Sequence, residues 1–205
     1  MSIPDTDATI AELEERFPLT FPKEVGEVVR AAYGQAEGIV EYGSGGSTLL
    51  AAGLGRYCVS VESSAEWAGR LEQGLKTAFP RAPVTMHPVD MGPTRWWGYP
   101  KDPSRWPDFH RYPLSVWSEV DAGRIDTVLI DGRMRKACFA ATLLHITRPT
   151  TIYFDDYRHR QEYHEVEEIL PRSALVRRMA VFEAVPGLVS GEAMAKVIGW
   201  FSELK

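Results

Sequence analysis

The chain has 205 residues, of which 44% are apolar, and this size suits a single α/β domain spanning residues 1–205. Lys and Arg number 23 against 28 Asp and Glu, so the net charge of −5 argues against a nucleic-acid partner. No apolar run is long enough to predict a membrane span or a signal peptide. Two isolated cysteines, Cys58 and Cys138, exclude a thiolate metal site and indicate reduced thiols. We therefore expect a soluble, cytoplasmic protein.

Residues 1–35 are predicted to form two helices. Asp7 and Thr9 can cap the first helix, while Pro22 and Gly34 fit the start and the end of the second. These helices lead into the predicted core of the domain.

From residue 38 onward, predicted strands alternate with predicted helices. Strands are expected at residues 38–41, 57–62, 83–90, 126–131 and 150–156, and helices begin near Ser47, Ser64, Met134 and Arg160. This alternation predicts a Rossmann-like, doubly wound, mostly parallel sheet with helices on both faces. Pro88 removes a backbone donor, which places the third strand near an edge of the sheet.

The carboxyl-terminal segment departs from this alternation. The runs "LVRRMAVFEAV" and "AKVIGWFSEL" are separated only by "PGLVSGE". We expect these two runs to pair as an antiparallel hairpin.

Residues 92–118 form a long segment rich in tryptophan and proline that directly follows the third strand. Such a loop in a compact domain is usually functional or disordered, and its aromatic content argues against disorder. It is a candidate lid in which Trp96, Trp97 and Trp106 wall an acceptor pocket. A packed flap or a homo-oligomer interface is the alternative.

The segment "EYGSGGST", residues 41–48, follows the first strand. Gly43 and Gly45 permit close approach of a ligand, and free N–H groups at the start of the next helix attract negative charge. A nicotinamide dinucleotide site requires a glycine where Thr48 stands. Glu62 follows Gly43 by 19 residues, which is the spacing of an acid that binds ribose hydroxyls. An adenosine ligand is therefore predicted, with a ligand-free tight turn as the alternative.

These motifs resemble the class I S-adenosylmethionine-dependent methyltransferases. The resemblance rests on "EYGSGGST", "VES", "VD", "LIDG" and "FDDY", which together span most of the chain. It implies a seven-stranded sheet ending in an antiparallel hairpin, S-adenosyl-L-methionine as cofactor, and methyl transfer to oxygen or nitrogen of a small-molecule substrate.

The resemblance also implies roles for residues by position. The glycine motif would hold the methionine part of the cofactor, the acid of the second strand the ribose, and the end of the third strand the adenine. The expected cofactor contacts are Glu41, Gly43, Ser44, Gly45, Glu62, Ser63, Asp90, Met91 and Asp131.

Three aspartates end the fourth and fifth strands. Asp131, Asp155 and Asp156 should converge, and like charges at close range require a cation or a proton. This resembles the metal-dependent O-methyltransferases, although Asp156 stands where that group has Asn. The resemblance implies a Mg²⁺ or Ca²⁺ site formed by these oxygen ligands.

Cations follow both strands, and they offer other partners for these acids. Arg133, Arg135 and Lys136 follow Asp131, while Arg158 and Arg160 follow the pair after the fifth strand. Either they neutralise the aspartates, or Arg133 and Arg158 bind an anionic acceptor. We rank neutralisation first, acceptor binding second and a metal third.

Methyl transfer depends mainly on alignment and on exclusion of water, because the sulfonium is an activated donor. Asp131, Asp155 and His159 are the candidate bases for the acceptor. The rival hypotheses are a non-catalytic binding or assembly protein, an NAD(P)-dependent oxidoreductase disfavoured by Thr48, and aminopropyl transfer disfavoured by the arginines.

Overall fold

A seven-stranded sheet forms the centre of the computed structural model, which describes residues 6–95 and 98–203. The strand order is β3-β2-β1-β4-β5-β7-β6; β1 to β5 run parallel, and β7 runs antiparallel to both β5 and β6. The strands are β1 (Gly38–Tyr42), β2 (Tyr57–Glu62), β3 (Val84–Pro88), β4 (Thr127–Ile130), β5 (Thr150–Phe154), β6 (Ala174–Val176) and β7 (Met179–Ala184). The predicted fold class is confirmed, and so is the edge position of the strand that contains Pro88.

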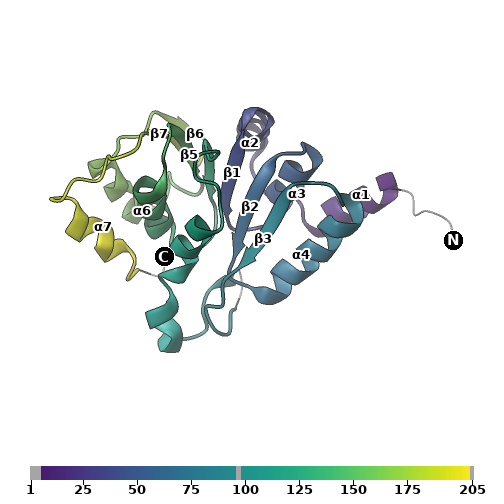
Figure 1. The fold of residues 1–205 in the computed structure, drawn as a ribbon, viewed down its shortest axis with the longest axis horizontal. Helices are drawn as coiled ribbons and strands as arrows, with labels where there is room; N and C mark the ends of the chain where they lie inside the picture. Colours follow the sequence, from purple (N-terminus) through teal and green to yellow (C-terminus); the bar gives the residue numbers. More distant parts are fainter. Residues whose placement is uncertain (1–5, 96–97, 204–205) are drawn as a thin grey trace.

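Helices cover both faces of the sheet (Figure 1). Figure 1 shows α1, α3 and α4 on one side of the strands and α6 and α7 on the other. The α-helices are α1 (Thr6–Arg16), α2 (Lys23–Gln35), α3 (Gly46–Gly53), α4 (Ala65–Ala78), α5 (Arg111–Leu114), α6 (Arg135–His145) and α7 (Met194–Trp200). The 3₁₀ helices are η2 (Pro103–Asp108), η3 (Ser115–Ser118) and η4 (Gln161–Glu168). No helix in the described part of the chain is long and apolar enough to cross a membrane.

Side-chain alternation along β1 divides the core between the two faces. Ile39 packs with Val29 and Tyr33 of α2, whereas Val40 and Tyr42 join the core cluster on the α6 side. The same alternation places the side chain of Glu41, the residue after Val40, beneath α2 and α3.

The antiparallel hairpin is present, but its strands differ from the predicted ones. Both β6 and β7 lie within residues 174–184, and they are joined at Arg177, whose backbone is left-handed with φ 56°. The segment expected to be the second strand instead forms α7. Its buried Val197 and Trp200 are three residues apart, which is a helical spacing.

Residues 92–118 contain two parts. In the first, an isolated antiparallel bridge pairs Thr94 with Pro100. The second packs into the core, where the indole N–H of Trp117 donates to the hydroxyl of Tyr42 at 2.8 Å. The second part is therefore a packed flap, and Trp106, with 66% of its surface exposed, is not among the residues that line the cavity described below.

Candidate active site

A cavity of about 470 Å³ opens at the carboxyl ends of β1, β2 and β4. Residues 43–47, 62–64 and 131–133 line it from these strand ends. Residues 17–21, which connect α1 to α2, close a further side. The cavity therefore contains the glycine turn and the acid of the second strand, as the sequence pattern places them.

Two glycines of the turn are required by the fold itself. Gly43 has φ 96°, and a Cβ there would lie 2.8 Å from the backbone of Gly132. A Cβ at Gly46 would lie 2.5 Å from the backbone nitrogen of Leu19. Gly45 has an extended φ of 172°, and its Cβ would meet nothing within 4 Å. The turn is thus packed against two neighbouring loops, and Gly45 faces open space.

Glu62 connects the end of β2 to the glycine turn. Its carboxylate accepts the backbone N–H of Ser64 at 2.8 Å and that of Ser44 at 3.3 Å. Burial raises the pKa of Glu62, while these hydrogen bonds act in the opposite direction. Ser63 donates its hydroxyl to the carbonyl of Gly98 at 3.1 Å, and both residues line this part of the cavity.

Glu41 lies beneath the turn and does not line the cavity, contrary to the expected cofactor contact. It is fully buried, and it accepts hydrogen bonds from the hydroxyls of Thr48 at 2.6 Å, Ser60 at 2.7 Å and Tyr33 at 3.3 Å. Burial raises its pKa. Thr48 in turn accepts the Gly45 N–H at 2.9 Å, so Glu41 supports the turn through Thr48.

The two residues expected to contact adenine also lie outside the cavity lining. Asp90 is exposed, accepts the Gly92 N–H at 2.8 Å and contacts Arg105 at 3.2 Å. Met91 is fully buried in the hydrophobic core. Asp90 is thus bound by Gly92 and Arg105, which belong to the segment 92–118.

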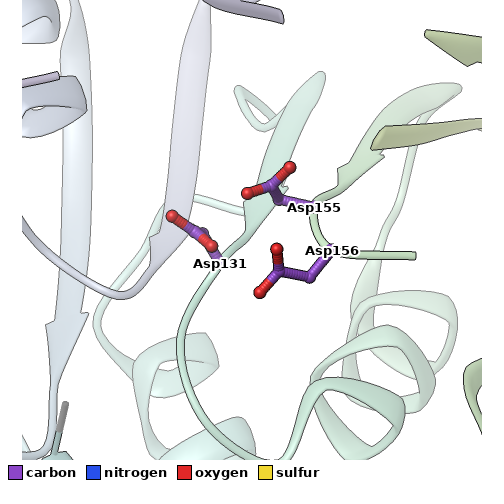
Figure 2. A group of neighbouring side chains, drawn as sticks. All are labelled: Asp131, Asp155 and Asp156. Carbon is purple, nitrogen blue, oxygen red and sulfur yellow. The ribbon is translucent and has the colours of Figure 1, made fainter. Parts of the chain in front are cut away.

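Three aspartates converge where β4 and β5 end, as predicted (Figure 2). Asp131, Asp155 and Asp156 each offer an oxygen within 4.8 Å of the others. Asp156 has a left-handed backbone with φ 57°, and so does Met134 with φ 49°. Such strain in residues other than glycine concentrates at functional sites.

Three arginines neutralise this cluster. Both oxygens of Asp155 accept from Arg178, at 3.0 and 2.7 Å. Arg135, which is buried, reaches Asp131 at 3.1 Å and Asp156 at 3.3 Å. The third contact is between Arg160 and Asp156 at 2.7 Å.

The residues present do not fit a divalent cation. Three guanidinium groups already balance the three carboxylates, and the fully buried Asp155 has both oxygens occupied by Arg178. A metal ion would have to displace at least one of these arginines and leave its charge unpaired. Of the predicted partners, Arg135 and Arg160 pair with the aspartates, whereas Lys136 pairs with Glu165 and Glu203 instead. Arg178 is a partner that the sequence pattern did not indicate.

Asp131 is the one candidate base among the three that lines the cavity. Its pKa is raised to about 7, chiefly by burial; Arg135 lowers it, and the neighbouring Asp155 and Asp156 raise it further. Asp155 is held by Arg178, and His159 is exposed and outside the cavity lining.

The predicted acceptor-binding residues separate in the structure. Arg133 lines the cavity, and its guanidinium lies 4.1 Å from the ring centroid of Tyr99. Arg158 is exposed and lies outside the cavity lining. Trp96 and Trp97 fall outside the described residues, so their predicted role stays a prediction.

Several lining residues were not expected from the sequence. Trp67 lines the cavity and donates its indole N–H to the carbonyl of Ser44 at 2.9 Å. Tyr112 contributes from the flap, and Arg95 contributes from the segment that precedes it. Residues 17–21 could have been found from the sequence. With Pro22 they read "FPLTFP", an apolar segment between two predicted helices, and such a segment is expected to pack against the rest of the domain.

The fold and the site together define the Rossmann-like methyltransferase fold. Its sheet has seven strands with β7 antiparallel, and a glycine turn and an acid meet at one cavity. A methyltransferase-like protein from Silicibacter pomeroyi is 40% identical, with a TM-score of 0.81 over 91% of this chain and 98% of that chain. The chain belongs to the class I S-adenosylmethionine-dependent methyltransferase family.

More distant solved structures share the fold. An O-methyltransferase from Bacillus cereus, in complex with S-adenosylhomocysteine, is 17% identical, with a TM-score of 0.62 over 89% of this chain and 92% of that one. TomG, an O-methyltransferase from Streptomyces achromogenes in complex with S-adenosylmethionine, is 15% identical, with a TM-score of 0.55 over 91% and 92%. No protein-family model and no curated protein matches the chain.

Proposed function

We propose that this protein binds S-adenosyl-L-methionine and transfers its methyl group to an oxygen or nitrogen atom of a small-molecule acceptor. The observation that carries the proposal is that the glycine turn and the Glu62 carboxylate line one cavity. Its volume of about 470 Å³ suits a small ligand. The cofactor-bound complexes of the two distant O-methyltransferases support the same choice of cofactor.

The lining residues suggest how the cofactor is held. Open space at Gly45 lets a ligand approach the backbone of the turn. Glu62 is suited to ribose hydroxyls because a carboxylate accepts hydrogen bonds. Residues 17–21 line the other side of the cavity, where they would exclude water from a bound cofactor. The sulfonium supplies an activated methyl group, so most of the rate acceleration comes from aligning the acceptor with that methyl group and from excluding water.

Asp131 is the base in this proposal. A carboxyl group with a pKa of about 7 is half ionised at neutral pH and is basic enough to accept a proton from an acceptor hydroxyl or amine. Arg135 orients it through the contact at 3.1 Å. No step requires a metal ion, because arginines already compensate the aspartate cluster.

Calorimetric titration with S-adenosylmethionine and S-adenosylhomocysteine tests the proposal. We expect both compounds to bind one site per chain with micromolar dissociation constants. Folded protein that binds neither of them at millimolar concentration would refute the proposed function. A titration with NADH serves as the control, and it should give no heat of binding.

A further inference from the structure

Arg133 is an unneutralised cation at the wall of the cavity. Arg135, two residues further along, pairs with Asp131, but Arg133 forms no ion pair with any residue in the described part of the chain. Its Nε is buried and has no hydrogen-bond partner there. The protein itself covers this Nε, so a ligand must bind the remaining N–H groups of the guanidinium, which donate to no residue in the described part of the chain although Arg133 lines the cavity. A cation without a partner in a binding site indicates a ligand that supplies an acceptor.

The position of Arg133 is fixed at both ends. Its backbone N–H donates to the hydroxyl of Tyr112 at 3.3 Å, and its carbonyl accepts from the thiol of Cys138 at 3.3 Å. Its guanidinium stacks on the ring of Tyr99 at 4.1 Å. Stacking on an aromatic ring leaves the edge of the guanidinium free for in-plane hydrogen bonds.

Tyr112 adds a second donor to the same wall. Its side chain is 1% exposed and lines the cavity. Its hydroxyl accepts from Arg133, but its own proton has no acceptor among the residues that the structure describes. Arg95, which is exposed, also lines the cavity. The carboxylates of the cavity are engaged elsewhere, Glu62 by backbone N–H groups and Asp131 by Arg135.

From this arrangement we infer that the acceptor carries a carboxylate group, which Arg133 and Tyr112 bind beside Asp131. Arg133 offers two parallel N–H donors that match the two oxygens of a carboxylate, and Arg95 adds positive charge. Asp131, two residues before Arg133, then stands near the nucleophilic atom of the same molecule. This inference rests on the proposed function, because it names the substrate class of the same site.

The test uses the full chain saturated with S-adenosylhomocysteine. Benzoate, salicylate and lactate are titrated by calorimetry beside their neutral amides, benzamide, salicylamide and lactamide. We expect at least one carboxylate to bind roughly tenfold or more tightly than its amide. The variant Arg133→Met should abolish this preference.

Arg124→Met is the matched control. Arg124 also stacks on a tyrosine, Tyr57, at 4.5 Å, but it lies just before β4, at the opposite end of the strands from the cavity. This variant should keep the preference for carboxylates. Both variants should unfold at temperatures close to that of the wild type.

The outcomes separate the two proposals. If S-adenosylhomocysteine does not bind, the proposed function fails and this inference fails with it. If it binds but no carboxylate is preferred up to about 10 mM, the inference alone is overturned. It is also overturned if Arg133→Met weakens S-adenosylhomocysteine about tenfold and leaves carboxylate binding unchanged, because Arg133 would then serve the cofactor.

Discussion

The carboxylate of Glu62 accepts the backbone N–H of Ser44 at 3.3 Å and so joins the end of β2 to the turn after β1. The same carboxylate holds the Ser64 N–H at 2.8 Å. One side chain thus orders the two loops that form most of the proposed cofactor site. A ligand whose hydroxyl groups donate hydrogen bonds to Glu62 would meet a carboxylate that the backbone already orients.

Glu62→Ala should weaken the binding of S-adenosylhomocysteine by about 1–3 kcal/mol, because a hydrogen-bonding carboxylate and the order of the turn are lost together. Calorimetry gives the two dissociation constants. Glu72→Ala on the exposed surface of α4 is the control, and it should bind as the wild type does. Equal affinity of Glu62→Ala and the wild type would remove Glu62 from the site.

Gly46→Ala and Gly45→Ala form a second matched pair. The Cβ of the first would lie 2.5 Å from the backbone of Leu19, so residues 17–21 must shift. We expect Gly46→Ala to lower the free energy of unfolding by about 1–3 kcal/mol. The Cβ of Gly45→Ala would meet nothing within 4 Å, so this variant should have the same free energy of unfolding in urea as the wild type. Similar losses in both variants would contradict this packing.

The order and type of most elements were predictable, because strand and helix periodicities are local. The bounds of β2 match the prediction, and the edge position of β3 followed from Pro88 alone. The hairpin was harder, since "AKVIGWFSEL" contains both a strand-like composition and a helical spacing. Only packing of Val197 and Trp200 onto the core decides in favour of the helix.

Site residues were predictable where the strand end itself points at the cavity, as at Glu62 and Asp131. They were not predictable where a distant segment supplies the partner. Asp90 is taken up by Arg105, and Asp155 by Arg178 of the hairpin turn. Glu41 was predictable in principle, because alternation along β1 places it on the same face as Ile39 and therefore beneath α2.

Mg²⁺ should not stabilise the protein. Since arginines balance the aspartate cluster, an ion gains little there and must release a guanidinium. Thermal unfolding in millimolar MgCl₂ and in EDTA should give melting temperatures within about 1 °C of each other. A rise of several degrees in Mg²⁺, reversed by EDTA, would show that the cluster rearranges to bind the ion.

Arg178→Met should be strongly destabilising. It leaves the fully buried carboxylate of Asp155 without its guanidinium, and breaking such a pair costs about 3–5 kcal/mol. Arg177→Met is the control in the same turn, because Arg177 pairs with Glu24 on the surface and should cost below about 1 kcal/mol. Urea unfolding measures both losses. Equal losses would mean that the Asp155 pair contributes no more than a surface pair.

The raised pKa of Asp131 predicts how stability depends on pH. Its carboxyl group titrates near 3.8 when unfolded and at about 7 when folded, so between these values the folded state binds more protons. The contribution of Asp131 to the free energy of unfolding therefore falls as the pH rises from about 4 to about 7, and it is constant above that. Asp131→Asn removes this contribution, while every other titrating group is common to both proteins. We expect the stability of the variant relative to the wild type to increase from about pH 5 to about pH 7 in urea unfolding. A difference that stays constant across this range would place the pKa of Asp131 near its ordinary value, and it would remove the reason for choosing Asp131 as the base at neutral pH.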